Sequence, residues 1–322
     1  MSEGTAARRV HAYAVAVAAA TFVLVVAGGL VTSTGSSLSV PDWPLSYGQV
    51  MPPMKGGVLF EHGHRLVAAA VGLLTVVLAV VLFRCERRRG VRMLGLAAAG
   101  AVIVQGILGG VTVLMELPVA VSVAHGTLGQ VFFVLVVLAA LTTSQGWRGP
   151  AEGTVRGRRL TVAFFAAAFL QLILGAWMRH EGAGLAIPDF PLAMGRVVPP
   201  LDTFPVALHF AHRTWAVVVA LLGVVTASRL LGGPATASRL RLPASVLLGL
   251  LALQIGLGGA VVLTLRSVVT TTSHVAVGAL ILATTAVLAL EANRTALPSR
   301  RVEGRDDSRE IACELAGGGV AP

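Results

Sequence analysis

Four histidines of this chain form two matched pairs, and imidazole is a side chain that binds metal ions and transfers protons near neutral pH. His64 and His212 each precede an arginine, in the segments EHGHR and HFAHR. His125 and His274 each follow a Gly-Gly segment, in AHGTLG and SHVAVG. Self-similarity at a nearly constant spacing indicates a duplicated module. Each copy of this module therefore carries two histidines.

A proline-rich segment precedes each His-Arg pair and belongs to the same repeat. The first copy reads GGLVTSTGSSLSVPDWPLSYGQVMPP and the second reads GAWMRHEGAGLAIPDFPLAMGRVVPP. Eight residues recur 147 positions apart, among them Asp42 and Asp189 between prolines. We expect these aspartates to shape the loop. A later segment is also duplicated, as QGILGGVTVL from Gln105 and QIGLGGAVVL from Gln254.

The composition is that of an integral membrane protein. The 322 residues have a mean hydropathy of +0.82 and only 12% charged residues, which excludes an ordinary soluble domain. About 20 apolar residues cross a bilayer as a helix. Stretches of this kind occur at 11–31, 62–83, 93–114, 121–143, 160–179, 208–230, 243–265 and 268–290. The expected fold is an all-α integral membrane protein with eight transmembrane helices in two tandem parallel-repeat four-helix bundles.

Most of the basic residues fall on one predicted side of the membrane. Of the 25 Lys and Arg residues, 19 lie in the termini and in the connections after even-numbered spans. The positive-inside rule places this side, with both termini, in the cytoplasm. We expect a multi-pass protein of the cell (plasma) membrane. The net charge of +10 then reflects topology, and no nucleic-acid partner is expected.

The repeat divides the chain into two halves that enter the membrane in the same direction, because four spans per copy is an even number. We expect an N-terminal bundle over 10–143, a cytoplasmic linker over 144–160 and a C-terminal bundle over 161–292. Residues 293–322 have the composition of a disordered cytoplasmic tail. Both proline-rich loops then lie on the outer side.

The four histidines are expected at nearly one depth, close to the outer face. Two imidazoles on neighbouring helices bind the iron of a planar haem from both sides. A bare metal ion is disfavoured, because copper or non-haem iron usually needs a third protein ligand. Glycines near this depth would admit a flat macrocycle, or would serve close helix packing. These glycines are Gly28, Gly29, Gly109, Gly110, Gly175, Gly258 and Gly259.

The two copies differ three residues before the first histidine of each pair. The first copy has Glu61 there and the second has His209. A carboxylate beside a haem site relays protons or stabilises a developing cation. The alternative is an exposed acid favoured by the helix macrodipole. Arg65 and Arg213 are suited to bind haem propionates, with snorkelling to lipid headgroups as the alternative.

The ordered combination of these elements resembles the haem A synthase family over residues 10–292. The matching elements are Glu61-x-x-His64-Arg65, the second copy ending in His212-Arg213, the Pro-Asp-aromatic-Pro-Leu loops, and the later His125 and His274. The resemblance implies an oxidoreductase that converts haem O to haem A for terminal oxidases. Successive hydroxylations of the C8 methyl group, and loss of water from the geminal diol, would leave the formyl group.

The resemblance also implies a role for each site residue. His212 and His274 would bind the iron of a resident haem b. His64 and His125 would hold the substrate haem O, with Glu61 as the acid implicated in catalysis. The implied partners are haem O, haem A, haem O synthase, terminal oxidase assembly factors and membrane lipid. Many bacterial members have a cysteine pair in the first external loop, and residues 32–50 of this chain contain no cysteine.

Two other classes of protein are compatible with four intramembrane histidines. One is a di-haem b electron-transfer subunit that reacts with quinone, which leaves the difference between Glu61 and His209 without an explanation. The other is a parallel-repeat transporter in which the histidines form a proton relay. A transporter of this kind would contain no haem after purification, so a visible spectrum separates it from the other two.

Overall fold

The computed structural model describes residues 3–149, 155, 157–232 and 238–294. Eight helices in this part of the chain are long and apolar enough to span a membrane, and these ranges contain no β-strand. The expectation of an all-α membrane protein with eight transmembrane helices is therefore confirmed. Part of the expected linker and residues 295–322 of the expected tail lie outside the described residues.

The first four spanning helices form one group. They are α1 (Glu3–Ser33), α2 (Gly57–Cys85), α3 (Arg89–Leu114) and α4 (Val119–Thr143). Helices α1 and α3 each contact both α2 and α4, so the four enclose a common centre. A short helix, α5 (Gln145–Arg148), follows.

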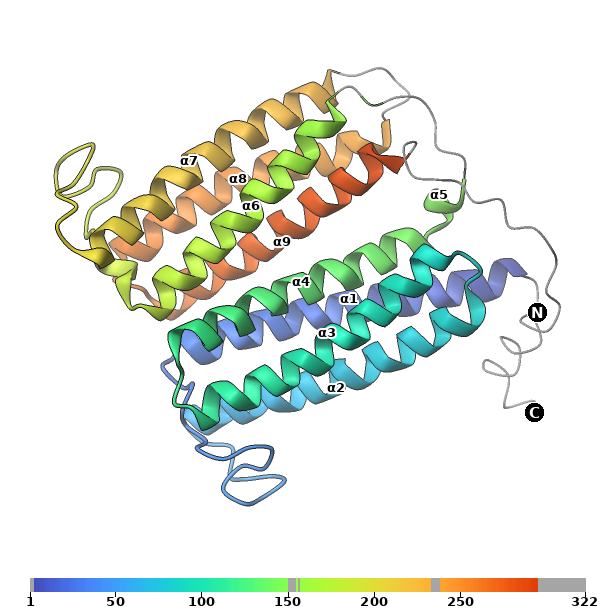
Figure 1. Ribbon diagram of the computed structural model, residues 1–322, viewed down its shortest axis with the longest axis horizontal. Coiled ribbons are helices and arrows are strands. Elements are labelled where there is room, and N and C mark those ends of the chain that lie inside the picture. The colour runs from blue at the N-terminus through green and yellow to red at the C-terminus, as the bar shows by residue number, and fades with distance from the viewer. Residues whose placement is uncertain (1–2, 150–154, 156, 233–237, 295–322) are drawn as a thin grey trace.

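The second group repeats this arrangement. It consists of α6 (Arg158–His180), α7 (Phe204–Leu231), α8 (Ser238–Leu263) and α9 (Val268–Ala292), with a 3-10 turn η1 (Ala183–Leu185) after α6. Helices α6 and α8 each contact both α7 and α9. The two groups lie side by side in Figure 1, with α1 and α4 of the first group against α6 and α9 of the second.

The helices mostly extend beyond the predicted apolar spans, because a helix continues past the edge of its apolar stretch. The exception is α8, which ends at Leu263 although the predicted span ran to residue 265. Leu265 and Arg266 have φ values of 50° and 64°, in the left-handed region that terminates helices. Glu116 and Leu117, with φ values of 56° and 62°, follow α3 in the same way.

The apolar core continues from one group into the other. Phe132 and Phe133 of α4 are 2% and 3% exposed and belong to the same cluster as Ala279 and Ala283 of α9. Small side chains at such a contact let helix backbones approach closely, which favours association where lipid supplies no hydrophobic drive. The two groups therefore meet along a packed seam.

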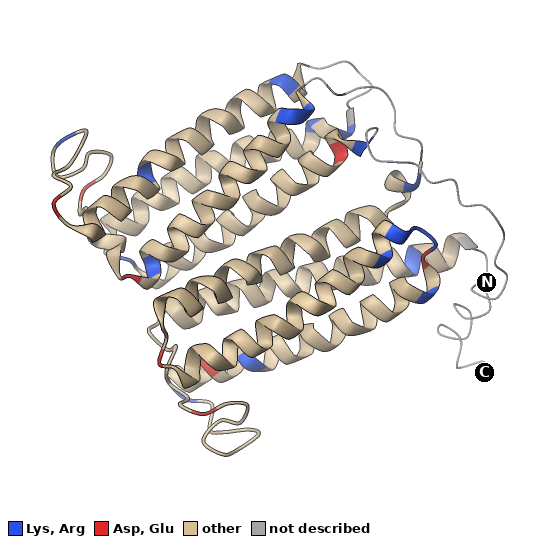
Figure 2. Cartoon of the chain, viewed as in Figure 1, with Lys and Arg blue, Asp and Glu red and all other residues tan. Residues whose placement is uncertain are grey.

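The two long connections, 34–56 and 181–203, emerge at the same end of the molecule (Figure 1). The described arginines gather mainly at the opposite end, as Figure 2 shows. This is the pattern that the sequence predicted for two halves with the same direction.

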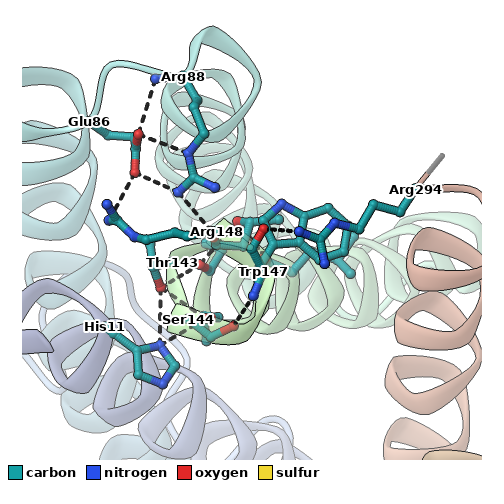
Figure 3. Close-up of polar contacts among 12 residues, drawn as sticks. His11, Glu86, Arg88, Thr143, Ser144, Trp147, Arg148 and Arg294 are labelled. Carbon is teal, nitrogen blue, oxygen red and sulfur yellow. Dashed lines mark hydrogen bonds and ion pairs between the residues drawn. The ribbon is translucent and has the colours of Figure 1, made fainter. Parts of the chain in front are cut away.

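A polar cluster at the arginine-rich end ties helix ends together (Figure 3). The Glu86 carboxylate, 6% exposed, accepts hydrogen bonds from Arg88 at 2.7 Å and Arg148 at 3.3 Å. Burial alone would raise the pKa of Glu86, but the hydrogen bonds and charge of Arg88, with the charge of Arg148, hold it below its ordinary value. His11, which the sequence analysis did not assign, lies with Nδ1 3.0 Å from the Ala140 carbonyl oxygen and joins α1 to α4.

Candidate functional site

The four repeat-related histidines lie toward the ends of their helices that meet the long loops. His64 and His212 are seven and eight residues after the first residues of α2 and α7. His125 and His274 are each six residues after the first residues of α4 and α9. With a rise of about 1.5 Å per residue, all four lie roughly 9–12 Å from a helix start. They therefore share a similar depth, as expected.

The imidazoles approach each other within each half. His64 and His125 lie within electrostatic reach of one another, and so do His212 and His274. Helices α2 and α4, which carry the first pair, are both packed against α1 and α3. The histidines that share a copy of the repeat are thus brought together in the centre of one group of helices.

Each imidazole lies against a glycine that stands five residues before the end of an adjacent helix. The pairs are Gly28–His64, Gly109–His125, Gly175–His212 and Gly258–His274. A Cβ atom on these glycines would lie only 3.0–3.3 Å from the imidazole Cε1. These four glycines thus serve close packing of a helix against a histidine ring, one of the two roles expected from the sequence.

The second glycine of each Gly-Gly segment in α3 and α8 makes room for a loop aromatic. A Cβ at Gly110 would lie 2.7 Å from Cδ2 of Trp43, and one at Gly259 would lie 2.8 Å from Cδ1 of Phe190. The aromatic residue of each Pro-Asp-aromatic-Pro-Leu loop is therefore seated on the end of a helix. This contact holds each loop over the helix ends of its own four-helix group.

Three of the four imidazoles have an amide neighbour that the sequence analysis did not assign. The pairs are Gln105–His125, Gln171–His212 and Gln254–His274, with the amide nitrogen 3.2–3.4 Å from a ring nitrogen. Leu24 occupies the position that matches Gln171, so His64 is the exception. Gln105 and Gln254 are the first residues of the duplicated segments, so their recurrence could have indicated a shared role. The interpretation from the sequence considered only the glycines of these segments.

The histidines fit the role of haem ligands. Among the described residues, the Nδ1 atoms of His64, His125 and His274 are buried without a hydrogen-bond partner. A buried nitrogen in this state is unfavourable unless another interaction compensates. The described residues contain no group of three or more His, Cys, Asp or Glu side chains arranged for a metal ion. Two imidazoles carried by two helices of one group suit a haem iron, because the macrocycle supplies the remaining ligands.

Glu61 and His209 occupy equivalent positions and have equivalent neighbours. Glu61 accepts hydrogen bonds from the Val40 amide at 2.9 Å and from Arg65 at 2.7 Å. Nδ1 of His209 lies 3.2 Å from the Ile187 amide nitrogen, and its Nε2 lies 3.1 Å from Nε of Arg213. A carboxylate accepts both bonds at once, whereas a neutral imidazole has one acceptor nitrogen. Glu61 is only 4% exposed, so it is not the exposed helix-start acid of the alternative interpretation.

Arg65 and Arg213 hold the loops, a role that neither sequence interpretation foresaw. Arg65 donates to the carbonyl oxygens of Asp42 and Leu45 at 2.7 and 3.0 Å. Arg213 donates to the carbonyl oxygens of Leu192 and Ile187 at 3.0 and 3.1 Å. Each guanidinium thus joins a loop to the helix that carries His64 or His212.

Asp42 and Asp189 shape the loops, as the sequence predicted. Tyr47 and Gly48 have φ values of 54° and 68°, and both amides donate to the Asp42 carboxylate at 2.7 and 2.8 Å. Asp189 accepts the equivalent pair of bonds in the second loop. The hydrogen bond from Gly48, followed by that from Tyr47, lowers the pKa of Asp42 below its ordinary value.

Comparison with known proteins shows the family to which the chain is related. The profile of the COX15-CtaA family, described as cytochrome oxidase assembly protein, matches residues 11–58 and 54–286. The chain belongs to the haem A synthase family. A "Heme A synthase" of Symbiobacterium thermophilum is 32% identical over 61% of this chain and 67% of its own length. One of Caulobacter sp. (strain K31) is 29% identical over 86% of this chain and 94% of its own length. All four histidines and Glu61 lie within the residues that match the family.

Proposed function

We propose that this protein is a haem A synthase, a membrane oxidoreductase of haem biosynthesis whose substrate is haem O. In the proposed reaction two successive two-electron hydroxylations of the C8 methyl group give a geminal diol, which loses water to leave the formyl group of haem A; an oxidant from outside the chain takes up the four electrons. The observation that carries the proposal is the pair of glycine-backed histidine sites, of which, among the described residues, only the first has a buried carboxylate beside it. Duplicated sites with different local chemistry are suited to different tasks.

The first half is the proposed substrate site. His64 and His125 would hold haem O through its iron, and Glu61 would accept or deliver a proton beside the reacting group. A resident haem b in the second half, held by His212 and His274, would supply electron-transfer chemistry. Glu61 is suited to proton transfer because its carboxylate is kept in one position by the Val40 amide and by Arg65.

Arg65 and Arg213 are proposed to assist haem binding at the outer end of each half. Their guanidinium groups hold the loops there and lie on the helices that carry His64 and His212. Haem propionates directed to this end would find bidentate donors in them. The position of the four histidines near the outer end supports propionates that point toward this end.

The proposed location is the cell membrane, with both termini in the cytoplasm. The support is the concentration of arginines at the end opposite the two long loops (Figure 2). The proposed partners follow from the reaction: haem O synthase would deliver the substrate, and terminal oxidase assembly factors would receive haem A.

The proposal is tested by pigment extraction after co-expression with an enzyme that produces haem O. Haem A should appear in membranes that contain this protein and be missing from membranes with an empty vector. If the purified protein carries haem b and yields no haem A, the di-haem electron-transfer subunit becomes the better assignment. Purified protein without haem would instead favour the transporter.

Changing Glu61 to Gln should lower the rate of haem O conversion by at least about tenfold. A side chain that transfers a proton typically contributes about 10²–10⁴-fold to a rate, and a water molecule takes over part of this role when the side chain is neutralised. The amide keeps nearly the same shape, so the haem b spectrum should stay as in the unmodified protein. Glu116→Gln serves as the control, since Glu116 is an exposed acid of the same half. Unchanged haem A yield in Glu61→Gln would reduce Glu61 to a loop-holding residue.

A valine at Gly258 should displace the His274 imidazole, because a Cβ there would lie 3.3 Å from Cε1 of the ring. We expect the low-spin haem b spectrum to shift and haem retention to fall by about tenfold, as for other groups that orient a metal ligand. Gly256→Val is the matched control, since Gly256 is exposed on the same helix and a Cβ there would meet no atom within 4 Å. Identical spectra for both variants would show that Gly258 does not orient the ring.

A further inference from the structure

One buried polar contact in the first half is replaced by an apolar contact in the second. Ser46 Oγ lies 2.7 Å from Nδ1 of His62, and the two residues are 0% and 5% exposed. The second half has Ala193 and Phe210 at the matching positions, within one apolar cluster. The turn itself is closed by the same two backbone hydrogen bonds in both halves. The turn therefore forms without the polar pair.

The polar pair is also an unfavourable way to stabilise this contact. Among the described residues, Nε2 of His62 is buried without a hydrogen-bond partner. Burial of a polar atom without compensation lowers stability, whereas an alanine and a phenylalanine fill the same place with no polar atoms. A role in positioning neighbouring groups explains the pair better than a role in stability.

The neighbouring group is the guanidinium of Arg65. Arg65 Nη1 donates to the Asp42 carbonyl oxygen at 2.7 Å and lies 3.5 Å from Ser46 Oγ. Within the described residues, Arg213 makes no counterpart of these two contacts. Arg65 Nη2 donates to the Glu61 carboxylate at 2.7 Å. The hydroxyl that His62 holds is thus in contact with the cation that binds the proposed catalytic acid.

The residues concerned follow one another around α2. At 3.6 residues per turn, the angular order is His64, Glu61, Arg65 and His62. A continuous polar arc therefore leads from the proposed haem ligand to the loop turn that contains Ser46. Contacts therefore connect the turn to Arg65 and Arg65 to Glu61.

We infer that the Ser46–His62 pair is a positioning element of the first half. It fixes the Arg65 guanidinium, and through it the Glu61 carboxylate, relative to His64. This inference rests on the proposed function, because it assigns to Glu61 a position that matters for the reaction of haem O. In the second half His209 stands where the first half has Glu61, and the residues that match Ser46 and His62 are apolar.

The second half supplies the substitution that tests the inference. Ser46→Ala with His62→Phe introduces the pair that packs at the equivalent turn. We expect the rate of haem A formation at saturating haem O to fall by about tenfold, as is typical when a group that orients a site residue is lost. The affinity for haem O, measured by optical titration, and the resident haem b spectrum should stay unchanged. A loop that merely opened would weaken haem O binding instead.

Two further variants separate positioning through Glu61 from other effects. His62→Asn, with Ser46 retained, places a side-chain amide near the position of Nδ1. This variant should keep most of the rate of haem A formation that the double variant loses. In a Glu61→Gln background the double substitution should cause little additional loss, because residues that act through one group are not additive. A full tenfold further loss in that background, or an unchanged rate in the double variant, would overturn the inference. If the double variant loses haem b, Ser46→Ala alone is measured by the same criteria.

The reciprocal change, Ala193→Ser with Phe210→His, is the matched control, because it alters the equivalent turn in the half that has His209 in place of Glu61. Haem A formation should be close to that of the unmodified protein. Failure of the proposed function would look different: the unmodified protein itself would form no haem A, while optical titration would still show whether haem O binds. A tenfold loss in the reciprocal variant would contradict a role confined to the first half.

Discussion

Replacing His64 or His125 by Ala is expected to abolish haem A formation while the haem b spectrum remains. Both imidazoles lie in the half that has the buried carboxylate, and each is backed by a glycine of an adjacent helix. Loss of a residue that only orients a metal ligand already lowers metal affinity or activity by about 10- to 100-fold, so loss of a ligand itself should lower haem A formation by at least about a hundredfold. Pigment extraction measures haem A, and the visible spectrum of the purified protein measures haem b.

His11→Ala is a suitable control for this experiment, because His11 lies at the opposite end of the same group of helices and bonds to a backbone carbonyl. It should affect stability more than conversion. A partly oxidised haem trapped in the His64 or His125 variant would also support the assignment, since the substrate would then be bound but not processed. Loss of all haem from either variant would reverse the roles of the two halves.

Replacing His212 or His274 by Ala is expected to remove most of the low-spin haem b signal from the purified protein. The two imidazoles lie within electrostatic reach of each other, and each has a glutamine amide beside a ring nitrogen. This supporting shell suits a permanently bound cofactor. We expect the haem b content to fall below about a tenth of that in the unmodified protein, because even the loss of a residue that orients a metal ligand costs about 10- to 100-fold in affinity.

Gln254→Leu separates the ligand from its support. Leu24 already occupies the position equivalent to Gln171, so a leucine is compatible with one of these sites. The substitution should shift the haem b spectrum and leave most of the haem bound, because His274 itself remains. An unaltered spectrum in both His212→Ala and His274→Ala would exclude these residues as ligands.

Much of the fold follows from local features of the sequence. Eight apolar stretches require eight helices, because a backbone inside a bilayer must satisfy its hydrogen bonds internally. The duplication predicts matching halves, and the even number of spans predicts loops at one common end. The position of Asp42 between prolines predicts a loop-shaping role, and in the structure two loop amides donate to its carboxylate. These features depend on residues close together in the chain.

The chemistry of the candidate site was predicted only in part. The four histidines and Glu61 were found because they recur, or fail to recur, at matching positions. The roles of Arg65 and Arg213 were missed, because hydrogen bonds to loop carbonyls depend on how each loop folds back 20 or more residues along the chain. The Ser46–His62 contact has no periodic pattern and appears only when the loop is docked.

The sequence by itself determined the membrane class, the duplicated halves, the depth of the four histidines and the single carboxylate that distinguishes the halves. Only the tertiary structure decided what the glycines accommodate and what holds the site residues in place. Gly28 and Gly258 are 36 and 16 residues from the imidazoles they contact. Contacts over such separations depend on how helices rotate and pack against each other, and the hydrophobic pattern of a chain that is apolar on nearly every face does not specify that rotation.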